Sequence, residues 1–339
     1  MRKLRVLSGI QPSGALHLGN YLGAIRHWVA RQETRESFIC IVDLHAITVP
    51  QDPAALLRQT RELAALLFAC GIDPARTTLF VQSHVRAHCE GAWLLQCLTP
   101  LGWLERMTQY KSKSGRQESV SAGLLTYPVL QAADILLYDA DEVPVGEDQK
   151  QHVELARDLA QRFNHLYGPT FRLPEPKIPP TGARIMGLDD PAAKMSKSAT
   201  GAKGHAVLLT DSDRDIEGAL RRAVTDSGRE IDWSDDPARA GVNNLLTIYA
   251  SITGRNREET VEDFAGARGY GDLKNRVAEV VIESVRPIRE RFSQLIANPG
   301  ELDRLLALGA NAARAVAEPK IEGMKRKVGL LVPDATRVG

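Results

Sequence analysis

The feature that most constrains the fold is a dense apolar run at residues 37–47, SFICIVDLHAI. Its β-branched and aromatic side chains leave no polar face, which is typical of a strand buried on both faces of a sheet. Shorter strand-like runs occupy residues 3–10 and 77–83, and segments with helical spacing separate the three runs. This alternation predicts an α/β fold, a Rossmann-like doubly wound parallel sheet with helices on both faces.

Later residues continue the pattern less regularly. We expect helices at 17–32, from Asp52 to Gly71, at 86–110 and at 122–138, then a strand at 142–146 and the amphipathic helix EDQKQHVELARDLAQRFNHLYG. Residues 169–182, PTFRLPEPKIPPTG, are rich in proline, so we expect a joint without regular structure there. From about residue 211 the spacing is helical to the end, which predicts a smaller all-helical domain.

Composition excludes several classes of protein. The chain has 339 residues with Lys+Arg 43 against Asp+Glu 42, and a net charge of +1 excludes a strongly basic nucleic-acid coat protein while allowing a local basic patch. No apolar run approaches a bilayer span, and Pro12 and Gly14 come too early for a signal peptide. We therefore expect a cytoplasmic protein without membrane contact. The cysteines have no zinc or disulfide spacing, and we expect reduced thiols at Cys40, Cys70, Cys89 and Cys97.

Glycines gather where the first strand ends and the first helix begins, in SGIQPSGALHLGNYLG. Ligands of open α/β sheets bind at the carboxyl ends of strands, where the start of a helix attracts phosphate. Glycine at position 19 lets a flat group such as a nucleotide base or ribose rest on bare backbone. The alternative is an ordinary turn whose glycines serve tight geometry.

A second candidate site is the segment PAAKMSKSATGAKG, residues 191–204, which has almost no apolar surface to bury and predicts a mobile loop. Lys194 and Lys197 stand on either side of Met195 and Ser196. Cleavage of ATP between its α and β phosphates concentrates negative charge on pyrophosphate, and two ammonium groups that approach only in the transition state lower that barrier selectively. The alternative is a solvated linker with incidental lysines.

Two further polar groups are candidates for ligand binding. GEDQKQH, residues 146–152, follows a predicted strand, so Asp148 and Gln149 can face a ligand or can simply cap the next helix. In LLTYPVLQAADILLYD the positions of Tyr127, Gln131 and Asp134 are i, i+4 and i+7, one stripe of one helix face. The stripe predicts a pocket with an aromatic wall, an amide and a carboxylate, or alternatively a partly exposed helix face.

Together these motifs resemble the bacterial-type tryptophanyl-tRNA synthetases, which are class I aminoacyl-tRNA synthetases. The resemblance extends over nearly the whole chain, through SGIQPSG, HLGN, DLHAITV, VPVGEDQKQHVEL, GARIMGL and KMSKS to NNLLTIY and VVIESVRPI. It implies an enzyme that joins tryptophan to ATP as tryptophanyl-adenylate, releases pyrophosphate, and then transfers tryptophan to the 3′ end of tRNA(Trp). It also implies a homodimer, with one tRNA bridging both subunits.

The resemblance also implies roles for individual residues. ATP would contact Gln11, Pro12, Ser13, Gly19, Asn20, Gly146, Glu147, Asp148, Ile185, Lys194, Met195, Ser196, Lys197 and Ser198. The residues implied to act on the phosphates are Lys113, Lys194 and Lys197. Tryptophan would contact Leu7, Gly9, His45, Tyr127, Gln131, Asp134, Ile135, Val143, Val145 and Gln149. No protein metal site is implied, and Mg²⁺ is expected to arrive with ATP on its phosphate oxygens.

Physical chemistry gives Asp134 a specific role as acceptor for the indole N–H. A buried carboxylate left without its donor is costly, so phenylalanine should be rejected by on the order of 10⁴-fold or more. Asn20 stands where the broader class has a second histidine, which agrees with the tryptophan branch. Gln131 stands where many bacterial members have methionine and the tyrosyl enzymes have glutamine, so it leaves the choice of amino acid slightly open.

By the same resemblance the chain divides into a catalytic domain at 1–204, a helical anticodon-binding domain at 205–290, and C-terminal helices at 291–339 that pack back on the first domain. Lysines and arginines in PKIEGMKRKVG form either a phosphate-contacting patch or a solvated terminus. The alternatives are a tyrosyl-tRNA synthetase, a nucleotidyltransferase with a related glycine motif, and a synthetase-like paralogue that binds tryptophan for regulation.

Overall fold

The computed structural model describes residues 2–110, 120–178, 184–196 and 204–333. Within these residues the sheet has five parallel strands in the order β3-β2-β1-β4-β5. Their bounds are β1 Leu4–Ile10, β2 Arg35–Ile41, β3 Thr77–Val81, β4 Glu142–Pro144 and β5 Glu175–Lys177. The strand order reverses between β1 and β4, and such a reversal opens a crevice at the carboxyl ends of the strands. The predicted doubly wound fold is confirmed.

Alternate side chains of the strands enter two separate cores. Ile39 and Ile41 of β2 pack with the helices on one face, and Phe38 and Cys40 pack with those on the other. The first face carries α1 Leu18–Asn20, the π-helical turn Tyr21–Ile25, α2 Arg26–Arg31 and α4 Pro53–Ala69. The second face carries α5 Ala87–Gln96, α8 Ala122–Leu136 and α9 Lys150–Tyr167. The continuous apolar run of β2 therefore reflects burial on both faces.

Three predicted elements need correction. The strand expected at 37–47 ends at Ile41, and α3 Asp43–Ala46 follows, because the Asp43 carboxylate accepts the backbone N–H groups of Leu44 and Ser83, each at 3.0 Å. The helix expected at 86–110 is interrupted before Pro100 and resumes as α6 Leu101–Glu105, since proline cannot continue a helix interior.

The third correction concerns the proline-rich segment, which forms the edge strand β5. Glu175 N donates to Asp141 O at 2.9 Å and Lys177 O accepts from Val145 N at 3.0 Å, so Pro176 between them turns its ring nitrogen away from the sheet. An edge strand tolerates proline there because that position needs no N–H.

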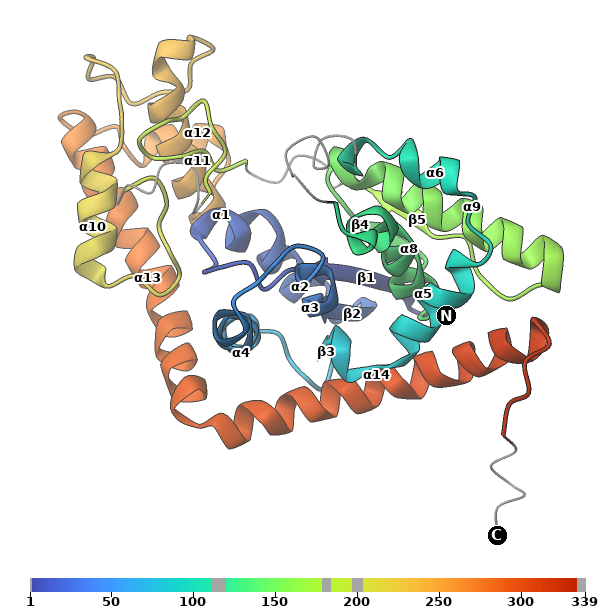
Figure 1. Ribbon diagram of the computed structural model, residues 1–339. Coiled ribbons are helices and arrows are strands. Elements are labelled where there is room, and N and C mark those ends of the chain that lie inside the picture. Colours follow the sequence, from blue (N-terminus) through green and yellow to red (C-terminus); the bar gives the residue numbers. More distant parts are fainter. Residues whose placement is uncertain (1, 111–119, 179–183, 197–203, 334–339) are drawn as a thin grey trace.

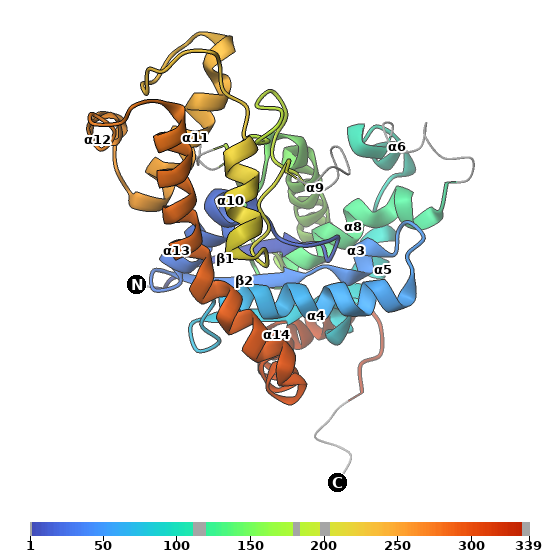
Figure 2. The same ribbon diagram turned by 90° about the vertical axis from the view of Figure 1, so that its left-hand side faces the viewer.

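The second half of the chain is helical, as expected. Its helices are α10 Asp213–Arg222, α11 Ala240–Thr253, α12 Arg257–Glu262, α13 Tyr270–Ala297 and α14 Pro299–Lys327. α10, α11 and α12 gather beside the upper part of α13, and α13 then descends past α4 to reach α14 (Figures 1 and 2). α10, α11 and α13 share the core that covers the first face of the sheet.

α14 crosses beneath the sheet and covers the edge strand β3 (Figure 1). Gly309 is in direct contact with this strand, because a Cβ at that position would collide with the carbonyl oxygen of Leu79. Covering an edge strand with a helix removes a site for uncontrolled strand pairing. No described helix is both long enough and apolar enough to span a membrane.

Candidate active site

The carboxyl ends of β1 and β4 border a cavity of about 390 Å³, termed here the first cavity. This volume is in the usual range for a small-molecule site. Its lining residues come from β1, β2 and β4 and the loops that follow these strands, from α3 and α8, and from the turn before α9: Leu7, Gly9, Gln11, Cys40, Val42, His45, Tyr127, Gln131, Asp134, Ile135, Val143, Pro144, Val145, Gly146 and Gln149. The fold thus brings together all ten residues that were expected to surround tryptophan. Cys40, Val42 and Pro144 also line it and were not predicted.

Asp134 is 2% exposed and lies at the centre of a hydrogen-bond network. Its Oδ1 accepts from Gln82 Nε2 at 2.7 Å and from His88 Nδ1 at 2.6 Å, and its Oδ2 accepts from His45 Nε2 at 2.8 Å. Burial alone would raise the pKa of this carboxyl, but the hydrogen bonds and positive potential of His45 and His88 lower it below the ordinary value. Asp134 is therefore a buried anion held by three donors.

The outer part of this network was missed by the sequence prediction. His88 Nε2 accepts from the hydroxyl of Tyr138 at 2.8 Å, and both residues are 0% exposed. The Asp134 carboxylate can only accept, so it fixes the tautomer of His88 with the hydrogen on Nδ1 and leaves Nε2 to accept from Tyr138. Gln82 follows the last residue of β3, and the rule that ligand-binding groups gather at the carboxyl ends of strands could have identified it.

Tyr127 forms an aromatic wall of the first cavity. Its ring meets that of His45 edge to face with centroids 6.1 Å apart, and its hydroxyl is hydrogen-bonded to His152 Nε2 at 3.0 Å. Burial, followed by the negative charge of Asp148, raises the pKa of Tyr127 to about 12, so the hydroxyl remains protonated at neutral pH. The wall therefore stays neutral beside Asp134.

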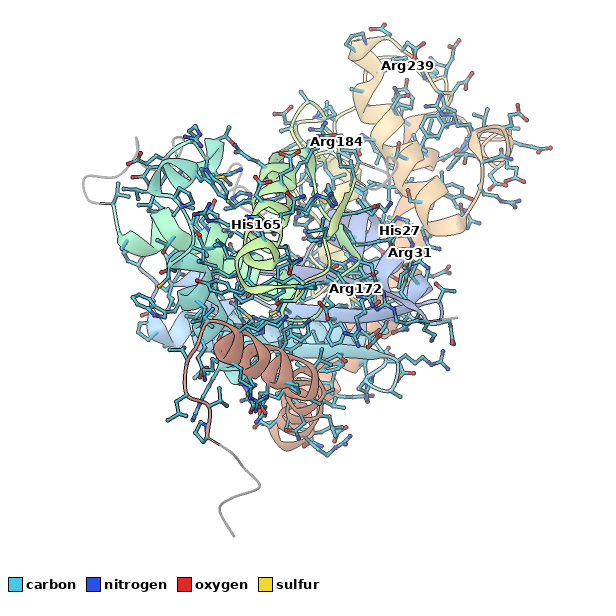
Figure 3. The ribbon with its side chains drawn as sticks, turned by 90° about the vertical axis from the view of Figure 1, so that its right-hand side faces the viewer. His27, Arg31, His165, Arg172, Arg184 and Arg239 are labelled. Carbon is cyan, nitrogen blue, oxygen red and sulfur yellow. The ribbon has the colours of Figure 1, made fainter. Side chains whose placement is uncertain are left out.

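A second cavity of about 370 Å³ lies on the opposite face of the sheet. Pro144, Val145 and Gly146 line both cavities, so the end of β4 is the wall between them. The cationic side chains around the second cavity are those of Arg31, Arg35, Lys177 and Lys194, beside the imidazole of His27, and Glu142 is the one carboxylate among its described lining residues. His27 and Arg31 project from α2 on the same side of the molecule (Figure 3). This charge balance favours an anionic ligand.

The predicted glycine turn contacts the start of the lysine segment, whose Lys194 lines the second cavity. Gly19 lies against the ring of His17 and against Met195, and a Cβ built at position 19 would stand 3.1 Å from His17 Nδ1. Met195 N donates to Ile185 O at 3.1 Å, and both side chains are almost completely buried in the core that contains Leu18. Lys194 precedes this anchor, and its side chain is exposed.

Comparison with known proteins agrees with this geometry. The family model for class I tRNA synthetases of tryptophan and tyrosine (W and Y) matches residues 1–286. The chain belongs to this family. A tryptophan–tRNA ligase from Caldanaerobacter subterraneus subsp. tengcongensis is 54% identical over 97% of this chain and 99% of the relative. That from Thermosynechococcus vestitus is 51% identical over 97% of this chain and 100% of the relative.

Solved structures show the same relationship. Tryptophanyl-tRNA synthetase from Campylobacter jejuni, complexed with ADP and tryptophan, superposes with a TM-score of 0.85 at 37% identity, covering 96% of this chain and 100% of the other. A tyrosyl-tRNA synthetase from Aeropyrum pernix has a TM-score of 0.66 at 24% identity and covers 90% of this chain, which shows a shared fold. The predicted family and the predicted enzyme class, aminoacyl-tRNA ligase, are confirmed.

The remaining predicted residues of this synthetase are placed as follows. Gln11 and Gly146 line the first cavity, and Gly146 and Lys194 line the second. Pro12 is buried and Ser13 exposed in the turn after β1, Asn20 ends α1, and Glu147 and Asp148 are exposed before α9. Ser196 is half-buried after Met195. Lys113, Lys197 and Ser198 lie outside the described residues.

Proposed function

We propose that this synthetase activates L-tryptophan in the first cavity and attaches it to tRNA(Trp) in two steps. The observation that carries the proposal is the buried Asp134 carboxylate on the wall of a cavity large enough for an indole. A carboxylate has about four acceptor positions, and three are filled by Gln82, His88 and His45. The fourth, on Oδ2, remains for the indole N–H.

This arrangement explains selectivity in physical terms. Indole donates one N–H and otherwise presents apolar surface, which Tyr127, Ile135 and Val143 match. Phenylalanine has no donor, and it would leave the buried acceptor unpaired at the cost of its lost hydrogen bond. The relatives named tryptophan–tRNA ligases, which this chain matches over nearly its full length, support tryptophan as the substrate.

ATP is proposed to bind beside Gly19, Gly146, Ile185 and Lys194, where the second cavity opens. In the first step a carboxylate oxygen of tryptophan forms a bond to the α-phosphorus while the bond to the bridging oxygen breaks, and pyrophosphate leaves with that electron pair. Cations from Lys194, and from Lys113 and Lys197, would stabilise this charge as it develops. In the second step a terminal hydroxyl of tRNA attacks the acyl carbon and AMP leaves.

Mg²⁺ is proposed to enter with ATP, bound by phosphate oxygens. Hard oxygen ligands from the substrate suit this ion, which usually has few ligands from the protein. Among the described residues no group of three or more His, Cys, Asp or Glu side chains could hold a metal ion. When present, the ion would neutralise charge on the phosphates alongside the lysines.

The proposed division of labour follows the chain. Residues 1–204 bind the small substrates, 205–290 read the anticodon, and 291–339 pack back on the first part. The contact of α14 with β3, and the Lys320 ammonium between Asp139 Oδ2 at 2.7 Å and Thr170 O at 2.9 Å, support this last assignment. The protein would act in the cytoplasm, where its tRNA is.

We also propose a homodimer, with the partner seated on an apolar groove of about 350 Å³ over α3, α5 and α8. Its large exposed side chains are Trp93, 66% exposed, and Ile47, 58% exposed. Tyr127 lines both this groove and the first cavity, so subunit association would steady a wall of the tryptophan site. Trp93→Glu should yield monomers in analytical ultracentrifugation and weaken tryptophan binding; an unchanged dimer places the interface elsewhere.

The decisive test of the function is ATP–pyrophosphate exchange with each of the twenty amino acids, followed by aminoacylation of a tRNA(Trp) transcript. We expect exchange with tryptophan alone, and for Lys197→Ala a fall of about 10²-fold or more with little loss of tryptophan binding. Exchange with tyrosine would identify a tyrosyl enzyme. Tryptophan binding without exchange or aminoacylation would instead identify a regulatory protein.

A further inference from the structure

His205 is buried where three segments of the candidate active site meet: the turn that contains His17, residues 187–189, and the start of the lysine segment. Its side chain is 4% exposed, and its Nδ1 is hydrogen-bonded to Asp189 Oδ1. Its Nε2 is also buried, and the described residues offer it no hydrogen-bond partner. A buried polar atom left unsatisfied costs about 1–3 kcal/mol, so its retention calls for an explanation.

The backbone next to His205 connects it to both halves of the proposed ATP site. His205 O accepts from Leu188 N at 3.0 Å, and Gly187 N donates to Ala193 O at 2.8 Å, immediately before Lys194. Two residues after His205, Val207 O accepts from Leu18 N at 2.8 Å. Residues 205–209 therefore join the turn that contains His17 to the segment 185–188, which is hydrogen-bonded to the start of the lysine segment.

Close packing fixes the imidazole of His205. It lies on the bare backbone of Gly187, where an added Cβ would collide with the ring. The nearby His17 is 7% exposed, and its Nδ1 is likewise buried without a partner among the described residues. An isolated antiparallel bridge between His17 and Leu208 holds the turn that contains His17 beside the segment that begins at His205.

We propose that His205, oriented by Asp189, is a positioning residue for adenylate formation. It holds the His17 ring and the Lys194 backbone in place relative to each other. Its contacts are with the protein groups that flank ATP. A displacement of about 1 Å in such a group can cost on the order of 10²-fold in rate. The inference rests on the proposed function, because adenylate formation is the step that it would affect.

The test compares His205→Gln, His205→Asn and His205→Phe in tryptophan-dependent pyrophosphate exchange, with full wild-type exchange as the reference. We expect kcat to fall about 10- to 100-fold in His205→Phe with little change in the Kd of tryptophan. Glutamine places a polar group near the Nε2 position and should restore most of the rate, whereas asparagine replaces Nδ1 and should restore less. His165→Phe, at an exposed histidine of α9, is the matched control (Figure 3).

The pH profile separates positioning from a loss of folding. Burial, then Lys194, then His205 lower the pKa of His17 to about 4. Removing His205 removes one of these causes, so the pKa of His17 should rise and the acid limb of kcat should move to higher pH. Far-UV circular dichroism checks that each variant is folded. A folded His205→Phe with wild-type kcat and an unmoved acid limb would overturn the proposal, whereas absent exchange in the wild type would fault the proposed function instead.

Discussion

Asp134 and Lys194 stand on opposite sides of the wall formed by the end of β4, and their surroundings are opposite in kind. Asp134 is 2% exposed and accepts three hydrogen bonds, while Lys194 is exposed and forms no ion pair among the described residues. A buried charge must have its partners before the substrate arrives, because desolvation without them is costly. An exposed ammonium remains hydrated and can direct its charge at a transient one. On the proposed function, selectivity would therefore depend on the buried, hydrogen-bonded Asp134, and charge stabilisation on the exposed Lys194.

The largest expected effect comes from Asp134→Asn. The amide keeps one acceptor oxygen but places an NH₂ group where the other accepted, so His45, His88 and Gln82 can no longer all donate. We expect exchange to fall by about 10³-fold or more and unfolding free energy to fall by about 3–5 kcal/mol, as when a buried pair is broken. Urea unfolding and pyrophosphate exchange measure the two effects. A stable variant with lost exchange would show that the network serves binding alone.

The pH dependence of unfolding tests whether the charge of the Asp134 carboxylate stabilises the fold. The folded pKa of Asp134 is lower than its unfolded pKa, so its stabilisation is complete above the unfolded value, near 3.8, and is lost as the pH falls further. The stability deficit of Asp134→Asn, which is its unfolding free energy relative to wild type, should therefore become smaller as the solution is acidified below about pH 4. Unfolding midpoints of both proteins at pH 7 and below about pH 4 check this sign. A deficit that stays constant across that range would show that the carboxylate charge does not matter.

Lys194→Ala is expected to affect the reaction alone. Its side chain is exposed, so truncation should leave unfolding within about 0.5 kcal/mol of wild type. Exchange should fall by about 10²-fold, since one cation proposed to face the departing pyrophosphate is lost, while the Kd of tryptophan is retained. Lys177→Ala, another cation of the second cavity that already pairs with Glu175 at 3.2 Å, is the control and should change exchange little. Equal losses of exchange in both variants would show that the total positive charge of the second cavity, and not Lys194 in particular, causes the effect.

The sequence predicted which residues of α8 border the first cavity, but not the full hydrogen-bond network that holds Asp134. Tyr127, Gln131 and Asp134 share one helix face by simple periodicity, and the structure places all three on the first cavity. The donors that hold Asp134 come from residues 46, 52 and 89 positions away, at His88, Gln82 and His45. No local pattern records which distant side chains meet at a sheet edge. The short strand β5 was missed for a similar reason, since pairing with β4 decides it.

Tyr138→Phe tests whether the part of the Asp134 hydrogen-bond network beyond the cavity wall contributes to function. The substitution removes one hydroxyl that donates to His88 at 2.8 Å, and it leaves the buried ring in place. We expect a loss of about 1 kcal/mol in unfolding free energy and a fewfold loss of exchange, because the buried Nε2 of His88 then lacks its hydrogen-bond donor. Thermal unfolding and the Kd of tryptophan measure these. Wild-type tryptophan affinity would limit the functional network to the three direct donors.

Gln131→Met should have the smallest effect. Gln131 lines the first cavity and is half-buried, and no hydrogen bond of its side chain is seen among the described residues. Methionine has nearly the same length and volume, so tryptophan exchange should stay within about threefold of wild type and tyrosine should still be rejected. Discrimination then depends on the unfilled acceptor position of Asp134, which methionine at position 131 does not alter. If tyrosine exchange appeared or tryptophan exchange fell tenfold, the amide would share the selection of substrate, and the rigid carboxylate would no longer account for it alone.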